Sequence, residues 1–64
     1  MNAIETAETA ILALQEGIDQ RDSEKILSAY RLIENSAFDW DDAPDCFDEW
    51  DKLTEEGNAI LYNE

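Results

Sequence analysis

Apolar residues in the first quarter of the chain recur at helical spacing. Steps of three, four, three and four residues separate Ile4, Ala7, Ile11, Leu14 and Ile18. Residues at such steps share one face of an α-helix. Asn2, three residues before Glu5, is suited to cap this helix, and Gly17 with the polar run Asp19-Gln20-Arg21-Asp22 indicates its end. The pattern therefore predicts a helix over residues 3–18.

Leu12 projects away from that apolar stripe. It either packs against a third element at the edge of the core or is exposed within a contact surface. Because single exposed leucines are common on protein surfaces, we do not read a contact surface into this residue. We expect Leu12 at the edge of the core.

A second apolar seam has the same period. It consists of Ile26, Tyr30, Ile33 and Ala37, flanked by Leu27, Ala29 and Leu32. Asp22 or Ser23 can cap this helix, which we expect over residues 22–35. The link of about four or five residues after the first helix favours an antiparallel pair.

The pattern breaks at residues 36–42, where Phe38 and Trp40 alternate with acidic residues as in an anchored loop. Asp42, two residues before Pro44, indicates the start of a third helix. At about 100° per residue, one continuous arc then contains the apolar and small positions Cys46, Phe47, Trp50, Leu53, Thr54, Gly57, Ile60 and Leu61. We expect one helix over residues 43–62. A stop at Gly57 followed by a short turn is the alternative, because glycine costs about 1 kcal/mol in a helix interior.

Three amphipathic helices with short links, and no segment of strand-like alternation, predict an all-α fold: a small three-helix bundle. The 64 residues form a single domain over 1–64. A domain of this size has a stability of roughly 3–10 kcal/mol. The chain is either a monomer or a homodimer that completes the core.

The charge of the chain restricts its partners. Seventeen Asp and Glu residues stand against four Lys and Arg residues, so the formal net charge is -13. Direct binding to DNA, RNA or an anionic membrane depends on cationic side chains. We therefore expect no direct nucleic acid or membrane contact, and a basic protein as any charge-driven partner.

The same composition bears on localisation and metals. A single Cys46 and no histidine exclude an internal disulfide and leave no ordinary zinc site. With no basic segment at the N-terminus and no apolar run longer than five residues, we expect a cytoplasmic protein. The acidic stretch from Asp39 fails the EF-hand pattern, because Ala43, Pro44 and Trp50 occupy positions 5, 6 and 12. We expect no metal and no cofactor.

The residue types of this chain give little support for a catalytic function. Without histidine, Ser and Cys side chains lack an ordinary base, and exposed carboxylates are poor general acids. Asp22-Ser23 resembles the phosphopantetheine attachment site of acyl carrier proteins. Glu24 stands where that family has an apolar residue, and the preceding loop is shorter, so we interpret Ser23 as an N-cap. We expect no enzyme.

Half of the residues from 39 to 56 are acidic. The carboxylates near the start of the third helix interact favourably with the helix dipole. The later carboxylates form like-charge pairs at helical spacing, which destabilise a helix. A small domain that keeps such repulsion suggests a use for it. We expect a partner-binding surface, with Trp40 as its apolar anchor and with acidic residues Asp39, Asp41, Asp42, Asp45, Asp48, Glu49, Asp51, Glu55 and Glu56.

In size, charge and helical simplicity the whole chain resembles the small acidic inhibitors of phages and mobile elements, which include anti-CRISPR, anti-restriction and uracil-DNA-glycosylase inhibitor proteins. Several of these proteins mimic DNA. The resemblance to the anti-CRISPR type implies an inhibitor that blocks DNA binding by an effector complex in the host cytoplasm. Two alternatives are an antitoxin or immunity protein that neutralises a basic toxin, and an acidic helical domain that is merely solvated.

Overall fold

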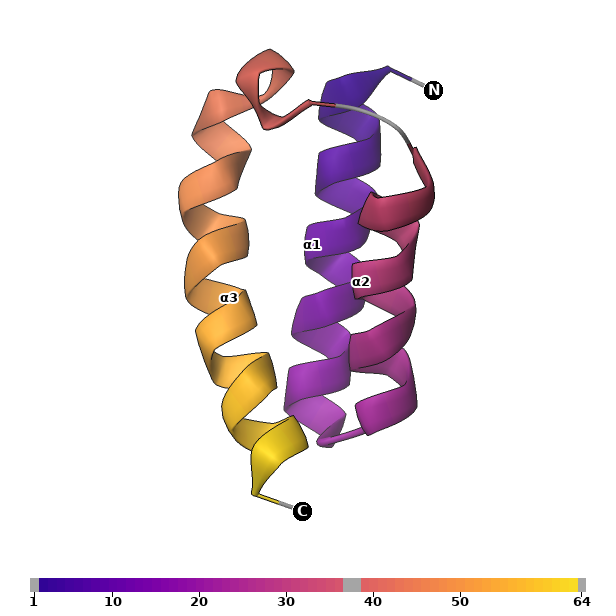
Figure 1. Ribbon diagram of the computed structural model, residues 1–64, viewed down its shortest axis with the longest axis vertical. Coiled ribbons are helices and arrows are strands. Elements are labelled where there is room, and N and C mark those ends of the chain that lie inside the picture. The colour runs from indigo at the N-terminus through magenta and orange to yellow at the C-terminus, as the bar shows by residue number, and fades with distance from the viewer. Residues whose placement is uncertain (1, 37–38, 64) are drawn as a thin grey trace.

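A computed structural model describes residues 2–36 and 39–63 (Figure 1). It contains α1 (Ala3–Gln20), α2 (Ser23–Ser36), the 3-10 turn η1 (Trp40–Asp42) and α3 (Pro44–Tyr62). α1 and α2 form an antiparallel pair, and α3 runs in the same direction as α1. The three-helix, all-α architecture predicted from the sequence is confirmed.

A side-chain cap and a left-handed residue define the two ends of α1. The Glu5 N–H donates to Asn2 Oδ1 at 2.8 Å, which confirms the predicted N-cap. The prediction that Gly17 ends the helix was wrong, because α1 continues to Gln20 and ends at Arg21, whose φ of 50° lies in the left-handed region. Gly17 is buried instead, and a Cβ there would lie 2.9 Å from the Ile26 backbone nitrogen. This glycine therefore allows α2 to approach α1.

Asp22 caps α2. Its Oδ1 accepts hydrogen bonds from the backbone N–H groups of Glu24 at 3.1 Å and Lys25 at 3.4 Å. Asp22 is thus the cap between the two that the sequence offered, and Ser23 is the first helical residue. The predicted seam residue Ala37 and the loop residue Phe38 lie outside the described residues.

α3 is continuous through Gly57, as predicted, because this glycine packs against the other helices. Its first residue is Pro44, whose missing N–H costs nothing at that position. The helix begins one residue later than the predicted residue 43. Asp42, which we interpreted as the start signal, ends η1 instead, and Ala43 occupies the N-cap position without a side-chain hydrogen bond.

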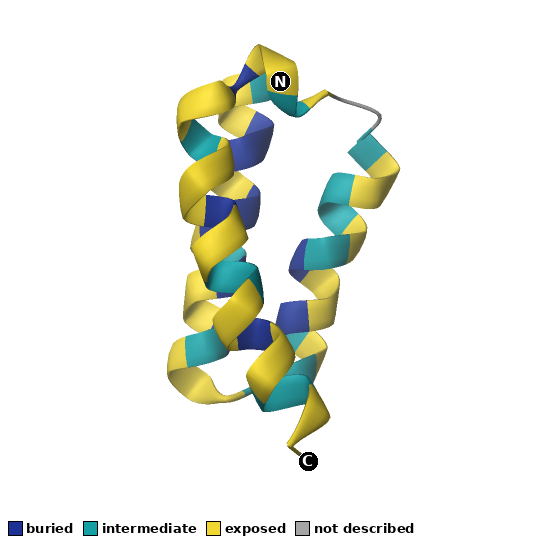
Figure 2. Ribbon diagram, turned by 60° about the vertical axis from the view of Figure 1, so that its left-hand side comes forward, coloured by how far each residue is buried: buried dark blue, intermediate teal, exposed yellow. Residues whose placement is uncertain are grey.

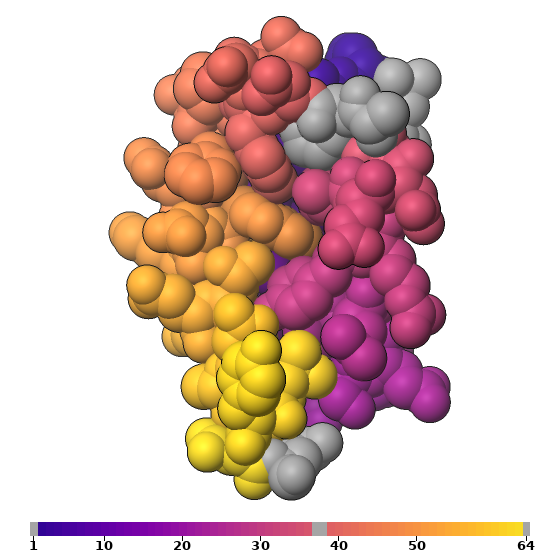
Figure 3. Space-filling model, in the orientation of Figure 1, coloured from indigo at the N-terminus to yellow at the C-terminus, as the bar shows by residue number. Residues whose placement is uncertain are grey.

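The core lies mainly between α1 and its two neighbours. Leu14 and Ile26 are its largest completely buried side chains. Around them are packed Ala10, Ile11, Ala29 and Trp50. Figure 3 shows side chains of α2 and α3 meeting in front of α1. Two residues are more exposed than predicted. Ile4, expected on the core face, is 51% exposed, and Leu12, expected at the edge of the core, is 66% exposed.

Tyr30 connects α2 to α3. Its hydroxyl lies 3.0 Å from Asn58 Oδ1, to which it donates, and its ring meets that of Trp50 edge-on at 5.9 Å. Burial, and secondarily the nearby Tyr62, raise the pKa of Tyr30. The folded state therefore favours the neutral phenol.

We expect the stability of the domain to fall at alkaline pH. Because the pKa of Tyr30 is raised by folding, its contribution is present below the unfolded value of about 10 and is lost as pH rises through the folded value. Urea unfolding at about pH 9 and about pH 11 measures this loss. Tyr30→Phe should reduce the loss, whereas Tyr62→Phe should retain most of it because burial is the larger cause. Equal pH dependence in wild type and Tyr30→Phe would contradict the assignment.

Candidate functional site

The outward side of α3 carries six exposed carboxylates, interrupted by Lys52, and Figure 2 colours most of that side as exposed. We call this surface the acidic face. It consists of Asp45, Asp48, Glu49, Asp51, Glu55 and Glu56. Neighbouring residues at three- and four-residue steps have their Cβ atoms about 5–6 Å apart. The face therefore presents a ladder of negative charges along the helix.

The acidic face points outward because the opposite side of α3 is apolar. Trp50 and Gly57 are buried, and Leu53, Ile60 and Leu61 are half-buried against the other helices. This segregation confirms the arc predicted from helical spacing, with one exception. Phe47 is 44% exposed, because it lies at the η1 end of the helix beside Trp40.

The η1 turn continues the acidic surface beyond the start of α3. Asp39, Asp41 and Asp42 are all exposed. Asp39 also has a structural role, since its carboxylate accepts the Asp41 N–H at 3.0 Å and caps the turn. The turn thus places its other two carboxylates next to the first turn of α3.

Trp40 is half-buried and packs within a group of aromatic rings. Its ring centroid lies 5.6 Å from that of Trp50 and 5.7 Å from that of Phe47. Together with Asp41, Pro44 and Phe47 it lines a pocket at the end of the bundle. The ring therefore anchors η1 on α3 and leaves part of its surface beside the acidic residues.

The carboxylates of the acidic face form no ion pair within residues 2–36 and 39–63. Among residues 2–36 and 39–63, the ion pair joins Lys25 Nζ to Glu16 Oε1 at 3.2 Å, between α2 and α1. Lys52 is exposed within the face itself, and the other cations, Arg21 and Arg31, belong to other elements. The like-charge repulsion on α3 is therefore not compensated by an ion pair among these residues.

A groove between α1 and α3 was not foreseen from the sequence. We call it the α1–α3 groove. Two adjoining pockets share Glu8 and Cys46; one also contains Leu12 and Glu49, and the other Ile4. The remaining lining residues are Ile11, Gln15, Asp42, Ala43, Pro44 and Asp45. The signal in the sequence was Leu12, which lies outside the apolar stripe of its helix.

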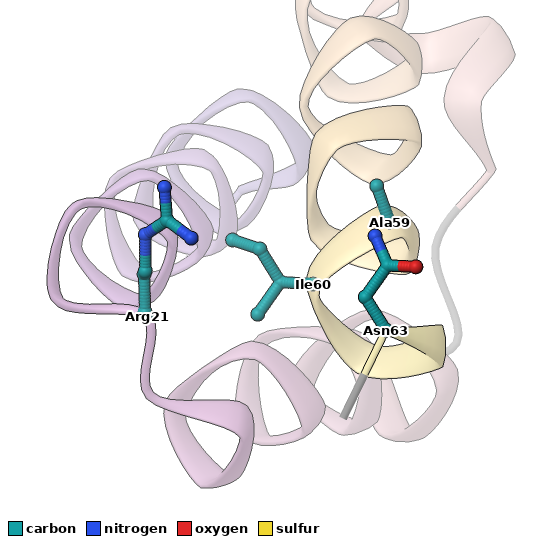
Figure 4. Close-up of a pocket in the computed structure, with 4 residues that line it drawn as sticks. All are labelled: Arg21, Ala59, Ile60 and Asn63. Carbon is teal, nitrogen blue, oxygen red and sulfur yellow. The ribbon is translucent and has the colours of Figure 1, made fainter.

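A further pocket lies where the α1–α2 turn meets the end of α3 (Figure 4). It is lined by Arg21, Ala59, Ile60 and Asn63. These side chains offer one guanidinium and one amide, but no nucleophile or general base. The one cysteine of the chain is remote from them and half-buried in the α1–α3 groove. Nor does any cluster of three possible metal ligands occur in the described part of the chain.

Comparison of the chain with protein-family models, curated proteins and solved structures gives no match. In the described ranges, none of the helices combines the length and the apolar character that crossing a membrane requires.

Proposed function

We propose that this chain is an acidic inhibitor that binds a basic nucleic-acid-binding protein or complex by mimicking nucleic-acid phosphates. The observation that carries the proposal is the acidic face: six exposed carboxylates on one side of α3 with no ion pair among the described residues. Such charges repel each other in the free protein, and a basic partner would relieve that repulsion.

The dimensions of the acidic face suit this role. Asp45 and Glu56 are separated by about 16 Å along the helix at a rise of 1.5 Å per residue. At about 3.4 Å per base pair, this length corresponds to roughly five base pairs of phosphate backbone. A cationic groove that accepts a duplex would thus meet negative charge along a comparable length.

Specificity requires more than charge, because buried aromatic side chains dominate the energy of most interfaces. The exposed part of Trp40 and the neighbouring Phe47 supply apolar surface beside the carboxylates of η1. The resemblance to anti-CRISPR-type inhibitors is consistent with an effector complex as the target, in the cytoplasm of the host cell.

Competition with DNA tests the proposal. The tagged chain is used to capture its partner from a lysate, the partner is identified by mass spectrometry, and binding of the purified pair is then measured against a short DNA duplex. We expect the duplex to displace the chain, and the affinity to fall steeply with salt. A captured protein that does not bind nucleic acid, such as a basic toxin, would contradict mimicry and favour the antitoxin alternative.

Charge reversal locates the binding surface. Replacing three residues of the acidic face by lysine should weaken binding by about 100-fold, because like charges facing each other cost several kcal/mol. These residues are Asp48, Asp51 and Glu55. A control with the same net charge reverses three exposed acids of the α1–α2 hairpin, namely Asp19, Glu24 and Glu34. If both variants are folded by circular dichroism and lose affinity equally, net charge rather than the acidic face determines binding.

A further inference from the structure

The α1–α3 groove combines exposed apolar side chains with acidic borders. Ile4 is 51% exposed and Leu12 is 66% exposed, although both belong to a helix whose other large apolar residues are buried or half-buried. Half-buried Cys46 contributes to both of the adjoining pockets. Ile4 and Leu12 thus place exposed apolar surface in both adjoining pockets, and grouped apolar residues open to solvent mark an interaction surface more often than scattered single residues do.

Carboxylates line the groove on both helices. Glu8 lies between Ile4 and Leu12 on α1, and Asp45 and Glu49, which also belong to the acidic face, lie across the groove on α3. Asp42 of η1 extends the border at one end. None of the four basic residues of the chain lines either pocket. The groove therefore combines exposed apolar side chains with carboxylates from α1, α3 and η1.

We propose that the α1–α3 groove binds a basic amphipathic helix of the partner protein. Apolar side chains of that helix would contact Ile4 and Leu12, and its Lys or Arg side chains would meet Glu8 and Glu49. The proposal rests on the proposed function, and it names the element of the basic partner that gives the interaction its apolar contact.

The spacing along α1 matches such a ligand. Ile4 and Leu12 are eight residues apart, which is about 12 Å or two helical turns. Apolar residues at three-, four- and seven-residue steps on an amphipathic helix repeat over the same length. A helix lying along the groove would thereby become the fourth helix of a bundle.

A second copy of this chain fits the groove less well. Each copy has a net charge of -13, and pairing two grooves would bring acidic borders against acidic borders. Like charges that face each other across an interface are strongly unfavourable. Charge complementarity therefore selects a basic partner.

A pair of synthetic peptides tests the proposal. The first is a helical peptide of about 18 residues with leucines at three- and four-residue steps and lysines elsewhere; the second has the same composition in an order without an apolar stripe. Both are titrated into the ¹⁵N-labelled chain at physiological salt. We expect the amphipathic peptide to bind at least about tenfold more tightly, since apolar contacts supply most of the affinity. Its largest chemical-shift changes should involve Ile4, Glu8, Leu12, Cys46 and Glu49.

Matched variants separate the groove from the acidic face. Leu12→Ala and Glu8→Gln should each weaken binding of the amphipathic peptide several-fold. Their controls on α2, Leu27→Ala and Glu34→Gln, should leave it unchanged, because Leu27 is also exposed but lies outside the groove. Replacing Asp48, Asp51 and Glu55 of the acidic face by lysine should weaken the binding of both peptides to the same extent.

Equal binding of the two peptides, or no effect of Leu12→Ala, would overturn the groove proposal while leaving competition with DNA by the acidic face intact. Failure of that competition, with the groove variants behaving as expected, would overturn phosphate mimicry alone. Sedimentation that shows a dimer abolished by Leu12→Ala would assign the groove to a second copy and would also overturn the proposal.

Discussion

Leu14→Ala is expected to lower the free energy of unfolding by about 2–5 kcal/mol. Leu14 is completely buried, and it lies in the cluster that joins α1 to both other helices. Truncation removes apolar contacts and leaves a cavity, because neighbouring side chains in a packed core relax only partly. A domain of this length has a total stability of roughly 3–10 kcal/mol. The variant should therefore be close to unfolding at room temperature.

Leu12→Ala is the matched control, since it makes the same change on the same helix. Leu12 is 66% exposed, and surface substitutions away from special features usually change stability by about 0.5 kcal/mol or less. Urea unfolding followed by circular dichroism at pH 7 measures both variants. Equal losses at the two positions would mean that the α1 face assigned to the core is wrong.

The helices were predictable from sequence because their apolar residues repeat with the helical period. α3 is the clearest case: Trp50, Leu53 and Ile60 occupy the predicted arc, and the acidic residues occupy the opposite side. The N-cap residues of the helices were less predictable, because several adjacent polar residues can each cap the same helix. Asp22 was one of two candidates for α2, and Asp42 was displaced by the 3-10 turn that precedes α3.

The roles of Gly17 and of Leu12 depend on tertiary contacts, which a single sequence does not specify. The polar residues that follow Ile18 suggested that α1 ends near Gly17. The helix instead continues to Gln20, and Gly17 lies where Ile26 of α2 approaches α1. Leu12 was expected at the edge of the core because the arrangement of α3 beside α1 was unknown. The groove that it lines exists only in the assembled bundle.

The acidic face was predictable in position, because helical spacing determines which residues share a side. Its function was not, since charge limits the class of partner but does not identify it. The alternation of Trp40 with acidic residues predicted an anchored loop, but it did not indicate that Asp39 would cap a 3-10 turn or that Trp50 would be the residue on which Trp40 packs. These contacts give Asp39 and Trp40 a structural role in the η1 turn.

Gly17→Val is expected to destabilise the domain by about 3 kcal/mol, at the upper end of the usual cost of adding atoms to a packed interface. A Cβ at this position would lie 2.9 Å from the Ile26 backbone nitrogen and 3.1 Å from Lys25 Cβ. The nearest atom belongs to the first turn of α2, so relief requires the two helices to separate. Gly17→Ala should also destabilise, by a smaller amount, because alanine favours the helix by about 0.8–1 kcal/mol over glycine.

Gly57→Ala provides the comparison that distinguishes backbone from side-chain obstruction. A Cβ there would lie 2.7 Å from the Tyr30 hydroxyl and 3.3 Å from side-chain atoms of Ile26 and Leu14. The tip of a tyrosine can turn away, at the loss of its hydrogen bond to Asn58, which is worth about 0.5–1.5 kcal/mol. Helix propensity offsets a similar amount, so Gly57→Ala should be nearly neutral in the same urea titration. A larger loss at Gly57 than at Gly17 would show that the closest helix contact of the bundle involves α3 rather than the α1–α2 hairpin.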